Sequence, residues 1–246
     1  MKRLLNILLI PFCLFAFASC EMFEIDNYDG PNASFFGGMK DAVTGELVET
    51  DIQNGTAIRV YELGWVDPPV VSQTWVVKQN GEFRNDMAFA SSYNLEIING
   101  NVYPLTMKDV KIKKGSNEYD FKVTPYIRVK NANITKNGNQ IVATFSLEAG
   151  NPEVKVSQIR LYAHSDIYVG EQVKYELQNV NDRETFNPAK EIDGTTYTLT
   201  IDLDVPQGGT TFNYSKNYYF RIGALASVSG VGTIRQNYAP YVVIPL

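Results

Sequence analysis

The side chains best suited to binding chemistry gather between Tyr61 and Trp75. In this stretch a Gly-Trp pair ending at Trp65 precedes Asp67 and two prolines. Proline fixes φ and cannot donate to a strand ladder, so the segment predicts a rigid loop that holds Trp65 near solvent. An indole ring stacks on the C–H face of a sugar, and a carboxylate accepts hydrogen bonds from its hydroxyls. We therefore take Trp65 as the first ligand-binding candidate, followed by Tyr61, Asp67 and Trp75.

Packing in a hydrophobic core is the competing interpretation for both tryptophans, because tryptophan is highly buried on average. This alternative fits Trp75 better, since Trp75 alternates with Val77 as residues of a strand do. Trp65 lies in the expected loop, where both interpretations stay open.

Residues for catalysis or metal binding are sparse. Asp202 and Asp204 share one face of an expected strand, where they could bind calcium or act as acid and base, but a strand places polar residues on its solvent side in any case. His164 is the only histidine, and no nucleophile elbow, zinc-binding helix or phosphate-binding glycine loop occurs. We expect no enzyme activity, no cofactor and no metal. A carboxylate-based glycosidase stays an alternative, because its two acids can come from any part of a chain.

The N-terminus has the composition of a bacterial lipoprotein signal. Lys2 and Arg3 precede an apolar stretch, and the small residues Ala18 and Ser19 precede Cys20. We expect residues 1–19 to be removed and Cys20 to carry the lipid that anchors the protein in the outer membrane. The competing interpretations are a transmembrane anchor, for which the apolar stretch is short, and a cleavable secretory signal with an incidental cysteine.

Composition limits the classes of partner. The formal net charge is −5, and loss of the two cations of the signal makes the exported chain more acidic, which disfavours nucleic acid and anionic lipid head groups. Cys13 would leave with the signal and Cys20 would carry lipid, so we expect no disulfide. Stability must then come from burial of apolar side chains.

The pattern of apolar residues predicts an all-β protein with two tandem antiparallel β-sandwich domains. Runs of four to eight residues alternate with period two between turn residues, and Asn80-Gly81, between residues 75–78 and Phe83, is the clearest hairpin signal. We expect a short acidic tether over residues 20–33, a first domain over 34–124 and a second over 125–246. In the second domain we expect strands at residues 127–130, 140–147, 158–163, 174–177, 197–203, 218–224 and 241–244, and short turns within 164–170 and 181–190.

Several motifs carry resemblances to known families. Residues 35–48 with an Asp-Ala-Val-Thr-Gly turn, then 58–61, 80–83 and 92–95, resemble a carboxypeptidase-regulatory-like, transthyretin-like domain. Residues 217–224 are similar to the sixth strand of a fibronectin type III or immunoglobulin-like sandwich, with Tyr218 or Tyr219 as its corner tyrosine.

The whole exported chain resembles a two-domain family of Bacteroidetes lipoproteins of unknown function, on residues 63–65, 73–76, 80–83 and the joint 121–129. Proteins of such families are commonly encoded near SusC/SusD-like glycan-uptake systems. The acidic residues that follow the lipidated cysteine resemble a signal for export to the cell surface. The resemblance implies a non-catalytic surface protein that binds an extracellular glycan, with SusC/SusD-like outer-membrane proteins as partners. The alternative is a structural adaptor of an outer-membrane complex that never contacts sugar.

Overall fold

The structure, a computed structural model, describes residues 29–246 apart from positions 66, 70–71, 179 and 205–211. The predicted signal and the predicted lipidation site Cys20 lie outside the described residues. The first strand begins at Ala33, one residue inside the segment expected to be a tether. Within the described part of the chain, no helix is long and apolar enough to cross a membrane.

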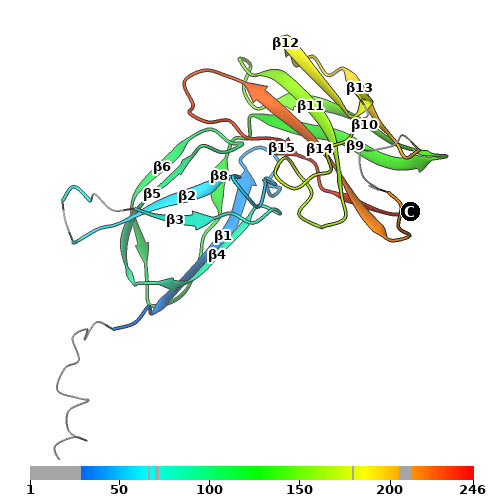
Figure 1. The fold of residues 1–246 in the computed structure, drawn as a ribbon. Helices are drawn as coiled ribbons and strands as arrows, with labels where there is room; N and C mark the ends of the chain where they lie inside the picture. The colour runs from blue at the N-terminus through cyan, green and yellow to red at the C-terminus, as the bar shows by residue number, and fades with distance from the viewer. Residues whose placement is uncertain (1–28, 66, 70–71, 179, 205–211) are drawn as a thin grey trace, which may run out of the picture.

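The first half of the chain forms two four-stranded sheets packed face to face (Figure 1). One has the order β4-β1-β7, with β8 also paired to β1, and the other has the order β3-β2-β5-β6. Phe35, Phe83 and Phe121 meet in the core between them, with ring centroids 5.2–6.4 Å apart. The strands are β1 (Ala33–Asp41), β2 (Ala57–Glu62), β3 (Gln73–Val76), β4 (Glu82–Ala88), β5 (Ser91–Ile98), β6 (Leu105–Ile112), β7 (Gly115–Glu118) and β8 (Phe121–Val123).

The Asn80-Gly81 turn closes a short hairpin, as the sequence predicts, but the strands on its two sides then join different sheets. Strand β3 pairs with β2 and β4 pairs with β1, so the turn carries the chain from one sheet to the other. The bridge between Val77 and Phe83 and the bond from the N–H of Lys78 to the carbonyl oxygen of Glu82, at 2.7 Å, link the two sides of the turn. Gly81 is required here, because its φ is 85° and a Cβ would lie 2.6 Å from the carbonyl oxygen of Val48.

The second half forms another pair of sheets, which confirms the all-β prediction. Their orders are β13-β10-β9 and β12-β11-β14-β15, with β16 also paired to β14. Tyr218 is fully buried and its hydroxyl donates to the carbonyl oxygen of Tyr214 at 3.2 Å, the contact of a corner tyrosine. The strands are β9 (Ile127–Asn137), β10 (Gln140–Ala149), β11 (Lys155–His164), β12 (Arg183–Glu191), β13 (Thr196–Asp202), β14 (Asn217–Ser227), β15 (Asn237–Tyr238) and β16 (Val242–Pro245).

The second domain departs from the prediction in two places. Residues 174–177 form no strand, because Lys174 bonds Glu171 while Leu177 inserts into the core from an irregular segment. The turn for which we considered residues 181–190 is confined to the 3-10 turn Val180–Asp182, and Arg183–Glu191 form strand β12, which the sequence did not predict. As an edge strand with a register shift against β11, β12 lacks the alternation that marks a half-buried strand.

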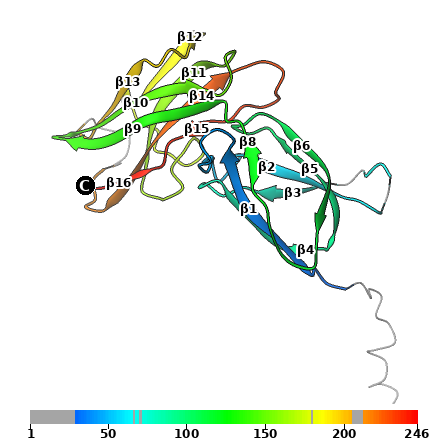
Figure 2. The same cartoon turned by 180° about the vertical axis from the view of Figure 1, so that it is seen from behind.

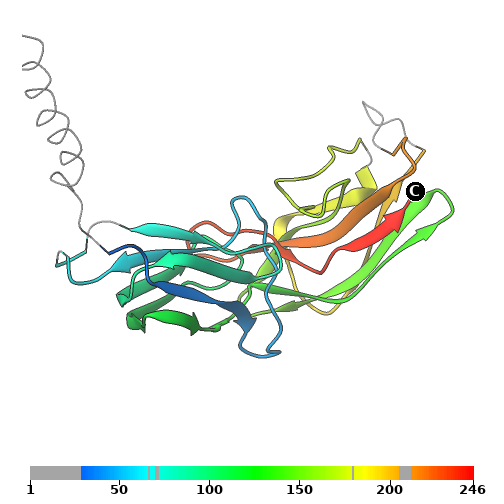
Figure 3. The same ribbon diagram turned by 90° about the horizontal axis from the view of Figure 1, so that it is seen from below.

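The two sandwiches lie end to end (Figures 2 and 3). Buried polar contacts join them. The fully buried Arg221 donates to the Glu49 carboxylate at 2.7 Å and to the carbonyl oxygen of Thr50 at 3.2 Å. Arg128 forms an ion pair with Asp41. Bonds of this kind demand fixed geometry, so they set the position of one domain relative to the other.

Candidate functional site

The outer side of the β3-β2-β5-β6 sheet presents polar side chains on adjacent strands. Ile58 and Val60 are buried in the core, so the alternating residues Arg59 and Tyr61 of β2 point outward. Arg59 lies in register with Thr74 of β3 and with Glu96 of β5. We call this surface, defined by Tyr61, Arg59, Thr74 and Glu96, the β2 face.

One end of the β2 face is the connection between β2 and β3. This segment, cyan in Figure 1, lies at the end of the first domain away from the second domain. Gly64 has a φ of 101°, which favours glycine, and the N–H of Leu63 bonds the carbonyl oxygen of Ser92 at 2.9 Å. Trp65 follows with 67% of its surface exposed, and Asp67 is exposed as well. The structure therefore places three of the four ligand candidates, Tyr61, Trp65 and Asp67, at this end of β2.

The structure corrects the prediction for the fourth candidate, Trp75. It is only 8% exposed and packs against Phe35 and Tyr93, with ring centroids 5.8 and 6.0 Å away. Its indole N–H donates to Gln73 at 3.2 Å. Trp75 is a core residue because it alternates with the outward-facing Thr74 and Val76, so it cannot offer a ring face to a ligand.

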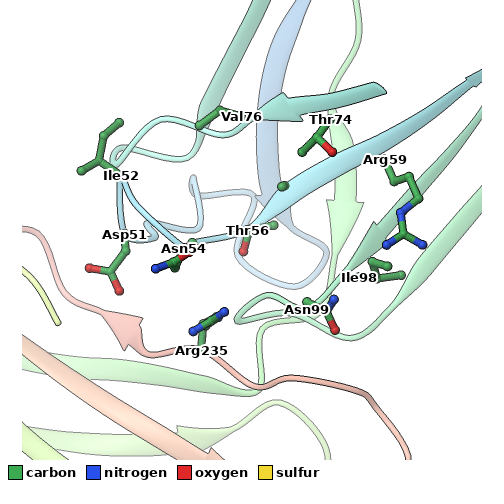
Figure 4. A pocket seen from close by; sticks show the side chains of 12 residues that line it. Asp51, Ile52, Asn54, Thr56, Arg59, Thr74, Val76, Ile98, Asn99 and Arg235 are labelled. Carbon is green, nitrogen blue, oxygen red and sulfur yellow. The ribbon is translucent and has the colours of Figure 1, made fainter. Parts of the chain in front are cut away.

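At its other end the β2 face runs into a pocket between the domains, with a volume of about 350 Å³ (Figure 4). The first domain supplies the segment before β2, the ends of β3 and β5, and Arg59, whereas the second domain supplies Arg235. The backbone N–H of Arg235 bonds the carbonyl oxygen of Gly100 at 3.0 Å, and the N–H of Thr233 bonds Asn99 Oδ1 at 3.0 Å. We call this hollow the interdomain pocket.

The two arginines of the interdomain pocket have loose or incomplete pairing among the described residues. Arg59 Nη1 lies 4.0 Å from Glu96 Oε2, too far for a hydrogen bond. The Nε atom of Arg235 is buried and has no hydrogen-bond partner among the described residues. A buried donor without an acceptor costs about 1–3 kcal/mol, which an acceptor on a ligand would recover.

Asp51 also lines the pocket, but its carboxylate is engaged elsewhere. Oδ2 accepts the Tyr238 hydroxyl at 2.7 Å and Oδ1 accepts the N–H of Glu171 at 3.1 Å. Burial raises the pKa of Asp51, against the opposing effects of the Tyr238 hydrogen bond and of nearby Arg221. Asp51 therefore fastens the two domains rather than serving as a free acid.

The residues considered for catalysis lie at ordinary structural positions. The N–H of Asp204 bonds Asp202 at 3.1 Å at the end of β13, and Asn139 bonds the Asp204 side chain, so these two carboxylates shape a turn. His164 ends β11, packs on Tyr175 at 4.7 Å between ring centroids, and has its pKa lowered mainly by burial. Across the described positions, no three His, Cys, Asp or Glu side chains form a cluster that could hold a metal ion.

Sequence reasoning missed the arginines of the pocket. The position of Arg59 between Ile58 and Val60 is a visible signal that its side chain faces outward. Arg235 has no local signal, because its role depends on how the second domain docks on the first.

The comparisons with known proteins match this architecture. Residues 35–124 match the "Protein of unknown function (DUF3823) N-terminal domain", and residues 127–242 match the "Domain of unknown function (DUF3823_C)". The chain belongs to the DUF3823 family. No curated protein sequence matches this DUF3823 chain.

Solved structures are similar over most of the chain. A protein from Bacteroides uniformis ATCC 8492, described as a "putative carbohydrate binding protein", is 53% identical, with a TM-score of 0.83, over 88% of this chain and 100% of its own. A DUF3823 family protein from Parabacteroides merdae ATCC 43184 is 22% identical, with a TM-score of 0.68, over 88% of this chain and 100% of its own. The second similarity bears on the fold alone.

Proposed function

We propose that this DUF3823 protein is a non-catalytic cell-surface lipoprotein that binds an extracellular glycan on its β2 face. The observation that carries the proposal is the exposed indole of Trp65 at the end of a sheet face that bears the outward-pointing Tyr61. Aromatic rings stack on the C–H faces of sugars, and the polar side chains between them offer donors and acceptors to hydroxyl groups. The description of the 53% identical relative as a "putative carbohydrate binding protein" supports the same class of ligand.

The proposal includes a location and partners. Cys20 would carry the lipid in the outer membrane, with the protein facing the cell exterior and delivering glycan to a SusC/SusD-like uptake complex. The N–H of Asn32, just before β1, bonds the carbonyl oxygen of Ala88, so the tether would leave from the end of the first domain where β4 ends. The side chain of Asn32 also accepts the N–H of Ala90 at 2.8 Å. The β2 face would then extend outward from the anchored end toward the second domain.

An adaptor without sugar contact is the second candidate, and one observation favours it. Met87 is 69% exposed and Phe89 is also exposed, near the point where the tether would leave. Exposed apolar side chains at one end of a domain suit a protein contact. An adaptor would co-purify with its outer-membrane partners whether or not Trp65 is intact.

Affinity electrophoresis tests the glycan proposal. The soluble chain 21–246, which contains every described residue, is run through gels that hold plant and host polysaccharides, together with Trp65→Ala and Tyr214→Ala variants. Tyr214 is a matched control, because it is an aromatic residue 65% exposed in the second domain. We expect one class of polysaccharide to retard both the natural chain and the Tyr214→Ala variant. The same polysaccharide should not retard the Trp65→Ala variant. No retardation by any polysaccharide would overturn the proposal and favour the adaptor.

A further inference from the structure

The interdomain pocket is lined by two cations from different domains. Arg59 projects from β2, and Arg235 projects from the segment before β15 (Figure 4). Arg59 is held only loosely by Glu96, at 4.0 Å, and Arg235 keeps a buried Nε–H with no partner among the described residues. These loosely or incompletely paired cations lie in a chain whose net charge is −5.

The acid in the pocket does not neutralise these cations. Both carboxylate oxygens of Asp51 are hydrogen-bonded, one to Tyr238 and the other to the N–H of Glu171. Both partners belong to the second domain, so the carboxylate of Asp51 is committed to the domain interface. Anionic groups of a ligand would therefore be the partners that satisfy Arg59 and Arg235.

We propose that the interdomain pocket binds an acidic saccharide, whose carboxylate or sulfate groups pair with Arg59 and with Arg235. A guanidinium presents a planar fork of donors that matches the oxygens of such groups. Thr74 and Asn54 line the same pocket and suit sugar hydroxyls, while Val76 and Ile98 offer apolar contact. The inference rests on the proposed function, because it names the class of glycan that the β2 face would bind.

The geometry also explains why two domains are needed. The bond from the Arg235 N–H to Gly100 and the bond from the Thr233 N–H to Asn99 fix the second domain's segment against the first domain. Neither domain alone carries both arginines. A site fixed before the ligand arrives loses less entropy on binding, so this docking favours affinity.

The test uses three polymers and three variants of the soluble chain 21–246. Polygalacturonate carries only carboxylates, carrageenan carries only sulfates, and neutral galactan carries neither. The variants are Arg59→Gln, Arg235→Gln and the control Arg84→Gln, whose arginine lies on the other sheet of the first domain and pairs with Asp86. We expect one acidic polymer to bind more tightly than galactan, and the affinity to fall at least about tenfold in each pocket variant and to stay unchanged in the control.

The outcomes separate the pocket from the proposed function. Binding of polygalacturonate assigns a carboxylate, and binding of carrageenan assigns a sulfate. Equal binding of neutral galactan, or loss of acidic binding in Arg84→Gln alone, overturns the pocket inference and leaves glycan binding in place. Failure of every polysaccharide to bind overturns both. Thermal unfolding checks each variant, and if Arg235→Gln does not fold, Arg59→Gln alone decides.

Discussion

The two outer faces of the first domain carry similar side chains but arrange them differently. On the face of the β4-β1-β7 sheet, which we call the β1 face, Phe36, Lys40, Arg84 and Asp120 line a hollow of about 410 Å³. Lys40 pairs with Asp120 at 2.6 Å, and Arg84 pairs with Asp86 at 2.8 Å while lying 5.0 Å from the ring centroid of Phe36. On the β2 face and in its pocket, by contrast, Arg59 lies 4.0 Å from Glu96, and the buried Nε of Arg235 has no hydrogen-bond partner among the described residues.

The difference shows how a binding surface is distinguished from a solvated one. Counting charges or aromatic rings does not separate the two faces, since each has both. The pairing state does, because a charge satisfied by its neighbour gains little from a ligand, whereas an unsatisfied donor gains a full hydrogen bond.

The largest expected effect separates the two sides of the β3-β2-β5-β6 sheet. Trp75→Ala removes a buried indole from the core and should lower the free energy of unfolding by about 3–5 kcal/mol. Trp65→Ala removes an exposed indole and should change it by less than about 1 kcal/mol. Urea unfolding followed by circular dichroism measures both. A loss of several kcal/mol in Trp65→Ala would make Trp65 a packing residue and remove the main reason for choosing the β2 face.

The next effect concerns the domain contact that gives the β2 face its pocket. Arg221→Met leaves the half-buried Glu49 carboxylate without its partner and should lower the free energy of unfolding by about 3 kcal/mol. This value is near the lower end of the range for breaking a buried ion pair, because Glu49 is partly exposed to water. We also expect weaker binding of any acidic polymer, since the position of Arg235 depends on this contact. The same unfolding measurement is made on Arg84→Met, for which we expect a change below about 1 kcal/mol. Equal losses in the two variants would mean that the interface does not hold the domains.

The third effect compares the carboxylate at the end of β1 with the carboxylate beside the β2 face. Burial alone would raise the pKa of Asp41, but hydrogen bonds from Arg128 and from the N–H of Val43 lower it below 3.8. Its stabilising contribution is present above about pH 3.8 and is lost as the pH falls through the lowered pKa. Asp51 has a raised pKa, caused first by burial, so its contribution is present below pH 3.8 and is lost as the pH rises through the raised value.

The asparagine variants test this difference. Compared with the natural protein, Asp51→Asn should gain relative stability as the pH rises from about 4 to about 7, whereas Asp41→Asn should lose relative stability as the pH rises from about 2 to about 4 and change little above that. Urea midpoints at about pH 2, 4 and 7 measure both changes. The same sign in both variants would contradict the assignment of the two carboxylates.

The smallest effect concerns the β1 face itself. Lys40→Met breaks an exposed ion pair with Asp120, and such pairs contribute about 0–1 kcal/mol. We expect nearly unchanged stability and unchanged retention by every polysaccharide, measured by thermal unfolding and affinity electrophoresis. Lost retention would shift the site to the β1 face.

Local patterns predicted much of the fold but not its pairing. Alternation around Ile58 and Val60 predicts β2, and the Gly64-Trp65 pair with the prolines predicts an exposed loop, because both signals depend on neighbouring residues alone. The Asn80-Gly81 turn shows the limit, since a turn sequence does not specify whether the next strand joins the same sheet. Strand β12 was missed because an edge strand needs no apolar alternation.

The site was predicted only in part for the same reason. Trp65, Tyr61 and Asp67 follow one another along the chain, so a local reading brings them together. Arg59 and Arg235 lie far apart in the sequence and come to line one pocket through domain docking, which no local pattern encodes. Trp75 was a candidate because of its residue type, and its alternation with Val77 was the stronger signal.

The two tryptophans allow a direct test of glycan binding on the β2 face. Each indole N–H gives one resonance in a ¹H–¹⁵N spectrum of the soluble chain, and a Trp65→Phe variant assigns the pair. The polysaccharide that retards the chain, shortened to soluble oligosaccharides, is then titrated into the natural protein. We predict that the Trp65 resonance shifts to saturation while the Trp75 resonance stays in place. Saturable binding that leaves the Trp65 resonance unmoved would contradict the account.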